Sequence, residues 1–331
     1  MEDQRQSSLF NPPDWGWAAV KGTPQLSSEC QTYQSQFNRF QNSSFAAQLS
    51  KNHHTCQSTS TTAIILRLHT GSNLVFSPDM IHFIRSLITE AGYTLNHSIH
   101  LLVHHNHDSI LTPSEKQSAL ESSPIPQEFH AICTVFTDGE MRQEFGDLVQ
   151  GTPHSGDPNL ALLWFLRRNA GVQFAWILED DVRYIGRWRD LFAQVQDVWA
   201  KSRKSGKNSD KMPDLVAFED ICEPVEDWVW WKTCESIWGR EKQRHTMGVI
   251  WGWSRELVNA MLEHIQAKQN CYYEVFPPSV AHNHGLSSLF IPIRCWIILR
   301  RGIDEFLLVL GLPRTHYIQG RKAFREDTRF P

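Results

Sequence analysis

Predominantly apolar runs alternate with amphipathic segments along the chain after residue 60. Runs of this length, rich in branched and aromatic side chains, are typical of strands buried in a parallel sheet. They occupy residues 62–68, 98–104, 131–136 and 174–178. We predict a strand at each of these runs and helices in the polar-faced segments between them.

Capping signals indicate where some of these helices begin and end. Ser77-Pro78-Asp79 combines an N-cap, a proline at the first helical position and an early acid, which predicts a helix to about residue 91. Gly92 would end that helix. Residues 137–139, Thr-Asp-Gly, predict a turn, with a helix following over 140–149.

The second half of the chain continues the alternation. Amphipathic patterns predict helices at 188–204 and 254–268, and apolar runs predict strands at 214–218 and 247–253. Strands and helices in alternation predict an α/β fold, in which a mostly parallel, Rossmann-like central sheet is flanked by helices.

Composition divides the chain into three parts. Of its 331 residues 41% are hydrophobic and 21% charged, which is typical of a globular protein. Residues 1–60 are rich in Gln, Ser and Asn, so we expect a loosely ordered N-terminal extension. We expect a single domain over 61–312 and a C-terminal tail over 313–331.

Charge and motif content exclude several classes of function. The formal net charge of −4 gives no reason to expect a nucleic-acid partner. No G-x-G-x-x-G follows the first predicted strand and no P-loop motif occurs, which argues against dinucleotide and P-loop chemistry. Seven cysteines without a C-x-x-C pair argue against a zinc knuckle, and permit up to three disulfides.

Three consecutive acids, Glu179-Asp180-Asp181, follow the apolar run 174–178 directly. Burying such charges unpaired would cost several kcal/mol each, so we expect them at the strand's end, where open α/β sheets bind ligands. Adjacent carboxylates repel one another and favour a divalent cation such as Mg²⁺ or Mn²⁺. The alternative is an acidic loop that caps a helix.

Glu274 is the second candidate for chemistry. It lies among aromatic and apolar neighbours, which would remove water from its carboxyl and raise its pKa into the range of a general base. The alternative is a half-exposed glutamate on an edge strand. His282 and His284 follow shortly afterwards, and either could complete a metal shell, touch a phosphate or lie in a surface loop.

Tryptophan is abundant, with 13 residues, and four of them fall within 225–238. This segment either lines an acceptor site or covers one end of the sheet, and the pattern does not choose between the two. The histidines at positions 104, 105 and 107 lie at a strand end and could bind a transition metal if other segments supplied further ligands.

In these features the chain resembles the nucleotide-sugar-dependent glycosyltransferases of the GT-A fold. Residues 178–182, Leu-Glu-Asp-Asp-Val, are similar to the family's D-x-D-type signature, and strand-to-helix units precede them. Residues 247–254 look like the acceptor-side strand-to-helix junction. Residues 273–279 are similar to the E-x-F-x-x-T/S segment that carries the base in the core-2 branching type. The resemblance covers about residues 60–300.

The resemblance implies a metal-assisted glycosyltransferase of the hexosyl- or N-acetylhexosaminyltransferase class. Asp181 would bind Mn²⁺ or Mg²⁺, with His284 as a further candidate ligand, and Glu179 or Asp180 would reach the ribose or a metal-bound water. Asp108 would contact the base of the nucleotide. Glu274 would deprotonate the acceptor, as in an inverting enzyme, whereas a retaining enzyme would need no base there.

The implied partners are a nucleotide-diphosphate sugar, with a UDP-sugar as the expected donor, and a glycan, glycoprotein or glycolipid acceptor. The resemblance places the nucleotide-sugar half at 61–186 and the acceptor half at 187–312. No signal peptide or membrane span is evident. The compartment stays open: the ER or Golgi lumen if the start is incomplete, the cytoplasm otherwise.

Two other functions use the same residues. A metal-dependent phosphoesterase would need a second metal, for which Glu219, Asp220, His282 and His284 are the candidate ligands. A catalytically silent carbohydrate-binding or scaffold protein would keep the fold and bind sugar through the tryptophan-rich segment.

Overall fold

A computed structural model describes residues 60–70, 75–149, 158–180, 182, 184, 186–202, 211–226, 228–291, 296–301 and 304–309. The expected N-terminal extension, apart from Ser60, and the expected C-terminal tail lie outside these ranges. Asp181, the predicted metal ligand, lies outside them too.

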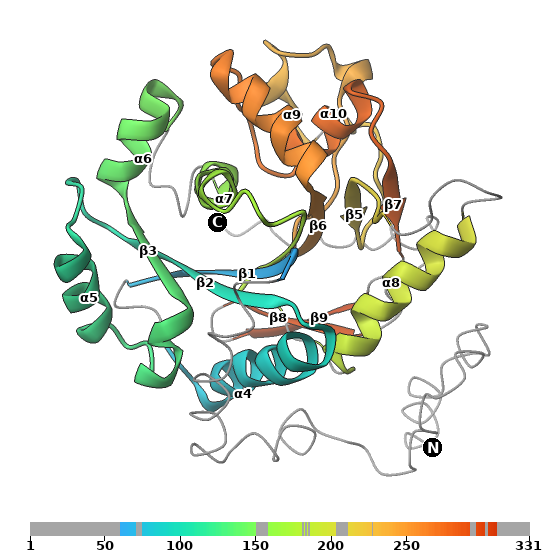
Figure 1. Ribbon diagram of the computed structural model, residues 1–331. Coiled ribbons are helices and arrows are strands. Elements are labelled where there is room, and N and C mark those ends of the chain that lie inside the picture. Colours follow the sequence, from blue (N-terminus) through green and yellow to red (C-terminus); the bar gives the residue numbers. More distant parts are fainter. Residues whose placement is uncertain are drawn as a thin grey trace, which may run out of the picture. The chain divides into compact units, whose positions relative to one another are not determined.

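A seven-stranded sheet forms the centre of the fold, in the order β3-β2-β1-β4-β6-β5-β7 (Figure 1). Strand β6 runs antiparallel to β4 and β5, and all other neighbouring strands pair in parallel. The predicted mostly parallel, Rossmann-like sheet flanked by helices is therefore confirmed. The strands are β1 Thr62–His69, β2 Ser98–His105, β3 Cys133–Thr137, β4 Phe174–Leu178, β5 Leu215–Ala217, β6 Ile250–Ser254 and β7 Ser288–Phe290.

Helices pack on both faces of this sheet. Alternate residues of β1 point to opposite faces, as the two-residue period of a strand requires. Ile64 and Leu66 belong to one apolar cluster with α4 and α8, while Ala63 and Ile65 belong to another with α7, α9 and α10 (Figure 1). The helices are α4 Pro78–Leu87, α5 Pro113–Glu121, α6 Asp138–Phe145, α7 Pro158–Arg168, α8 Trp188–Ser202, α9 Arg255–Gln266 and α10 Phe276–Asn283.

Shorter elements complete the described chain. They are the π-helix η3 Ile88–Tyr93 and the 3₁₀ helices η4 Gln127–Ile132, η5 Gly146–Leu148, η6 Val229–Cys234 and η7 Arg240–Lys242. Strands β8 Trp296–Arg301 and β9 Asp304–Val309 form a separate antiparallel pair. Within the described ranges, no helix has both the length and the apolar character needed to cross a bilayer.

The first predicted helix begins as expected and ends differently. The Ser77 side chain accepts a hydrogen bond from the Met80 N–H, as an N-cap should. Gly92 does not end the helix, because the chain continues from α4 into the π-helix η3, which contains Gly92. This widened turn carries the buried Glu90, whose carboxylate accepts the Trp188 N–H at the start of α8 at 2.8 Å.

The turn predicted at 137–139 is wrong, because α6 begins there. Thr137 is the N-cap of α6: its hydroxyl accepts from the Glu140 N–H, and the Glu140 carboxylate accepts from the Thr137 N–H. This reciprocal capping box satisfies two backbone N–H groups that a helix start otherwise leaves unpaired. The T-x-x-E spacing was visible in the sequence, but the Asp-Gly pair favoured a turn.

Candidate active site

Glu179 is the first residue after β4, and it is paired across the sheet. Parallel pairing puts Leu178 opposite Leu66, so the next residues, Glu179 and Arg67, come side by side. The Glu179 carboxylate accepts a hydrogen bond from Nη2 of Arg67 at 2.9 Å, and both side chains are largely buried. The predicted strand-end position of the acids is thus observed for Glu179, with an arginine as its counter-charge.

Glu274 lies in the turn before α10, not on an edge strand. Its Oε1 accepts from the Tyr273 hydroxyl at 3.3 Å and from the Gly248 N–H at 3.4 Å. Burial raises the pKa of this carboxyl to about 7, and the nearby negative charges of Glu179 and Glu219 add to the rise. The environment therefore has the desolvation expected of a general base, while a catalytic role stays a prediction.

Tyr273 is held as a neutral phenol beside this carboxyl. Its burial raises the pKa of the hydroxyl, and the charges of Glu179 and Glu274 raise it further, with Arg67 opposing. A neutral phenol retains its proton, so the O–H group of Tyr273 donates the hydrogen bond to Glu274.

Glu219 brings a third carboxylate to the same region, from the end of β5. Its Oε2 accepts from the Met247 N–H at 3.1 Å, and its backbone carbonyl accepts from the Thr246 hydroxyl at 2.8 Å. The other carboxylate oxygen, Oε1, is buried and has no hydrogen-bond partner. A buried carboxylate oxygen without a donor is costly and favours a cation or a hydroxyl nearby.

The oxygen-rich character of this region suits Mg²⁺ or Mn²⁺, which prefer carboxylate ligands. The orphaned Oε1 of Glu219 is the observation that fits such an ion. Within the described residues, no group of three or more His, Cys, Asp or Glu side chains has the arrangement of a complete metal site. Asp180 is half-buried next to Glu179, and Asp181 follows it outside the described ranges.

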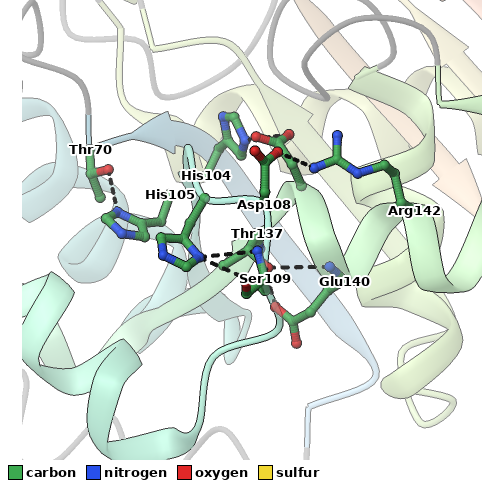
Figure 2. Close-up of polar contacts among 10 residues, drawn as sticks. Thr70, His104, His105, Asp108, Ser109, Thr137, Glu140 and Arg142 are labelled. Carbon is green, nitrogen blue, oxygen red and sulfur yellow. Dashed lines mark hydrogen bonds and ion pairs between the residues drawn. The ribbon is translucent and has the colours of Figure 1, made fainter.

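Asp108 lies three residues beyond β2. Its exposed carboxylate pairs with the guanidinium of Arg142 on α6 (Figure 2). The neighbouring histidines have separate partners: Nε2 of His104 is 3.0 Å from Asp138, and Nδ1 of His105 is 2.9 Å from the Thr70 hydroxyl (Figure 2). Contact between Asp108 and a nucleotide base stays a prediction.

His284 lies at the opposite end of α10 from Glu274. Its Nε2 is 3.0 Å from Nε2 of His264 on α9, and the His284 side chain is exposed. The structure therefore brings together Glu179 and Glu274 but separates His284 from them by the length of a helix. Metal binding by His284 stays a prediction that this placement does not favour.

Two residues at the site did not enter the sequence-based prediction. Arg67 is the one charged residue within the run 62–68, and this charge in a predicted buried strand is a signal by which it could have been found. Tyr273 adjoins Glu274 in the sequence, but its hydrogen bond to that carboxylate required the structure.

Comparison with known proteins identifies the family. Residues 20–211, more than half of the chain, match the family model described as "Protein of unknown function (DUF3405)". The chain belongs to the DUF3405 family. The match includes β1 to β4 and the acids at 179–181, while Glu219 and Glu274 of this DUF3405 protein lie beyond it. No curated protein matches the chain.

Solved structures resemble this DUF3405 protein only distantly. A galactosyltransferase, LgtC, in complex with donor and acceptor sugar analogues is 10% identical, with a TM-score of 0.35, over 70% of this chain and 74% of that one. The 4-diphosphocytidyl-2C-methyl-D-erythritol synthase of Anaerococcus prevotii is 8% identical, with a TM-score of 0.36, over 80% of this chain and 100% of that one. Similarity of this degree does not establish a function for the DUF3405 protein. Its function must be inferred from its own residues.

Proposed function

We propose that the protein is a metal-assisted glycosyltransferase that moves a sugar from a nucleotide-diphosphate sugar to an acceptor hydroxyl. The observation that carries the proposal is the half-buried Glu274 carboxyl, with a pKa of about 7, close to the acid that begins the 179–181 signature at the end of β4. A general base is most effective when its pKa is near the working pH.

Glu274 is the base in this proposal, and the reaction inverts the anomeric carbon. The carboxylate takes the proton of the acceptor hydroxyl while that oxygen bonds to the anomeric carbon. The bond from this carbon to the diphosphate breaks, and its electron pair leaves with the nucleoside diphosphate. The Tyr273 hydroxyl and the Gly248 N–H orient the Glu274 carboxylate through Oε1.

Asp181 is the proposed ligand of Mn²⁺ or Mg²⁺, with Glu179 or Asp180 next to it for the ribose or a metal-bound water. When bound, the ion supplies positive charge against the departing diphosphate. Arg67 fixes the Glu179 carboxylate in place through the 2.9 Å ion pair. A UDP-sugar is the proposed donor, and Asp108 the proposed contact to its base.

Nucleotide-dependent thermal stabilisation tests this proposal directly. UDP, GDP, CMP and ADP are each added with Mn²⁺ or with EDTA, and the unfolding midpoint is recorded. A ligand at one hundred times its Kd adds about 2.7 kcal/mol of stability, which moves the midpoint by a few degrees. We expect a shift from UDP that disappears with EDTA and in Asp181→Ala.

The matched control is Asp190→Ala, which removes an exposed acid from the first turn of α8. This variant should keep the full nucleotide shift. No shift from any nucleotide in the native protein would contradict the proposal and favour a silent carbohydrate-binding protein. If transfer is observed, the anomeric configuration of the product, read by NMR, separates inversion from retention.

A further inference from the structure

Three aromatic rings connect the solvent to the Glu274 carboxylate. Trp230, on η6, is 48% exposed, and its ring stacks on that of Tyr272 with 4.7 Å between centroids and 16° between planes. Tyr272 contacts Tyr273 at 5.0 Å, and Tyr273 donates to Glu274. We call Trp230, Tyr272 and Tyr273 the aromatic strip.

The aromatic strip is held in place covalently. A disulfide between Cys234 and Cys271 joins the end of η6 to the residue before Tyr272. The Tyr272 N–H also donates to the Thr233 hydroxyl at 3.1 Å. Trp230 and Tyr272 therefore keep their relative position without a ligand, which reduces the entropy lost when one binds.

Trp230 has no role in the core of the fold. Trp176, Trp188, Trp251 and Trp253 are buried almost completely. Among the described residues, Trp230 is the one tryptophan classed with the exposed large hydrophobic side chains. Leaving a tryptophan partly in water forgoes the stabilisation that burial would provide, and Trp and Tyr rings of this kind are enriched at interfaces.

Two cationic side chains lie near Trp231, the residue that follows Trp230 on η6. The Arg240 guanidinium is 5.7 Å from the ring centroid of Trp231, and the Lys232 ammonium is 6.0 Å from it; both side chains are exposed. A pyranose ring has an apolar C–H face and a rim of hydroxyls. The exposed, flat ring of Trp230 offers an apolar surface that matches the C–H face.

We propose that the aromatic strip binds the acceptor glycan, with one pyranose ring stacked on the open face of Trp230. Another residue of the same glycan presents its hydroxyl at Glu274. The strip contains two ring-to-ring steps, so the expected acceptor is an oligosaccharide rather than a single sugar. This inference rests on the proposed glycosyltransferase function, because it assigns the acceptor side of that site.

Binding to an array of defined oligosaccharides tests the strip. The full chain is compared with Trp230→Ala, Trp230→Phe and the control Ile110→Ala, which truncates an equally exposed apolar side chain after β2. We expect native-like binding by Ile110→Ala, a loss of about tenfold or more in Trp230→Ala, and a smaller loss in Trp230→Phe. Unfolding midpoints of the variants verify that each is folded.

Two results would overturn the proposal: no glycan bound by the native chain, or equal binding by Trp230→Ala. The same glycans displayed on lipid and on peptide linkers distinguish a glycolipid acceptor from a glycoprotein acceptor.

Steady-state kinetics separates failure of the strip from failure of the enzyme. If transfer occurs, Trp230→Ala should raise the KM for the acceptor about tenfold or more and leave the KM for the donor unchanged. If transfer occurs but Trp230→Ala leaves the KM for the acceptor unchanged, the proposed acceptor role of the aromatic strip is wrong and the proposed glycosyltransferase function stands. Trp230-dependent glycan binding without any nucleotide response would overturn the glycosyltransferase instead.

Discussion

The guanidinium of Arg67 on β1 lies 2.9 Å from the carboxylate of Glu179 at the end of β4. This ion pair joins two adjacent parallel strands at the edge where their carboxyl ends meet. It neutralises one acid of a region that also contains Glu219 and Glu274. Arg67 thereby permits several carboxylates to lie close together in the native fold.

Arg67→Ala should lower the free energy of unfolding by about 1–3 kcal/mol, because it removes a charged hydrogen-bond donor from the largely buried Glu179 carboxylate. Urea denaturation measures the change. The control is Arg142→Ala, which breaks the exposed pair with Asp108 and should cost less than about 0.5 kcal/mol. Equal losses in the two variants would show that the Arg67–Glu179 pair contributes no more to stability than the exposed Arg142–Asp108 pair.

The pH dependence of transfer should report Glu274 as a base. The carboxyl must lose its proton to act, so kcat/KM should rise about tenfold per pH unit below 7 and level off above it. Glu274→Gln should lower kcat by about 10²- to 10⁴-fold and remove this limb of the profile. A Glu274→Gln enzyme with near-native kcat would rule out the base assignment.

Protein stability should depend on the same carboxyl. Its pKa is raised in the fold from an ordinary value of 4.5 to about 7, so the folded state binds a proton that the unfolded state releases. This contribution is fully present below about pH 4.5 and is lost as pH rises to about 7, a difference of up to about 3 kcal/mol. The free energy of unfolding of the native chain relative to Glu274→Gln should therefore fall across this window. A difference that stays constant with pH would contradict the raised pKa.

Removal of the Cys234–Cys271 disulfide should destabilise the protein by about 2–4 kcal/mol, since the bond closes a long loop of the unfolded chain. Thermal unfolding of Cys234→Ser/Cys271→Ser measures the loss. Dithiothreitol should lower the midpoint of the native chain more than that of the double variant. The two chains would respond equally to dithiothreitol if this disulfide were absent from the native protein.

Glu90→Ala should weaken the start of α8. The variant removes the acceptor of the Trp188 N–H, while the indole N–H of Trp188 keeps its bond to the Ser86 hydroxyl. We expect a loss of about 1–3 kcal/mol in urea denaturation, the usual result of leaving a buried donor unpaired. Asp190→Ala, in the exposed first turn of the same helix, should change stability by less than about 0.5 kcal/mol.

Local patterns predicted the elements well where one strong signal was present. The strand over 174–178 was predicted with its observed bounds, because a run of apolar residues ends there in acids. The Ser77 cap was also read correctly. The predicted helix end at Gly92 and the predicted Thr-Asp-Gly turn are wrong. At Gly92 the chain continues in a π-helix, whose Glu90 contacts α8. At 137–139 the capping box of α6 prevails over the turn signal of the Asp-Gly pair.

The sequence by itself determined the mostly parallel α/β sheet and the delivery of acids to the end of β4. Both follow from hydrophobic periodicity and from the cost of burying charge, which act over short stretches of chain. Only the tertiary structure decided that Arg67 pairs with Glu179, that Glu219 and Glu274 come near them, and that His284 instead faces His264. Counter-charges and desolvation depend on which distant segments pack together, and no local pattern contains that information.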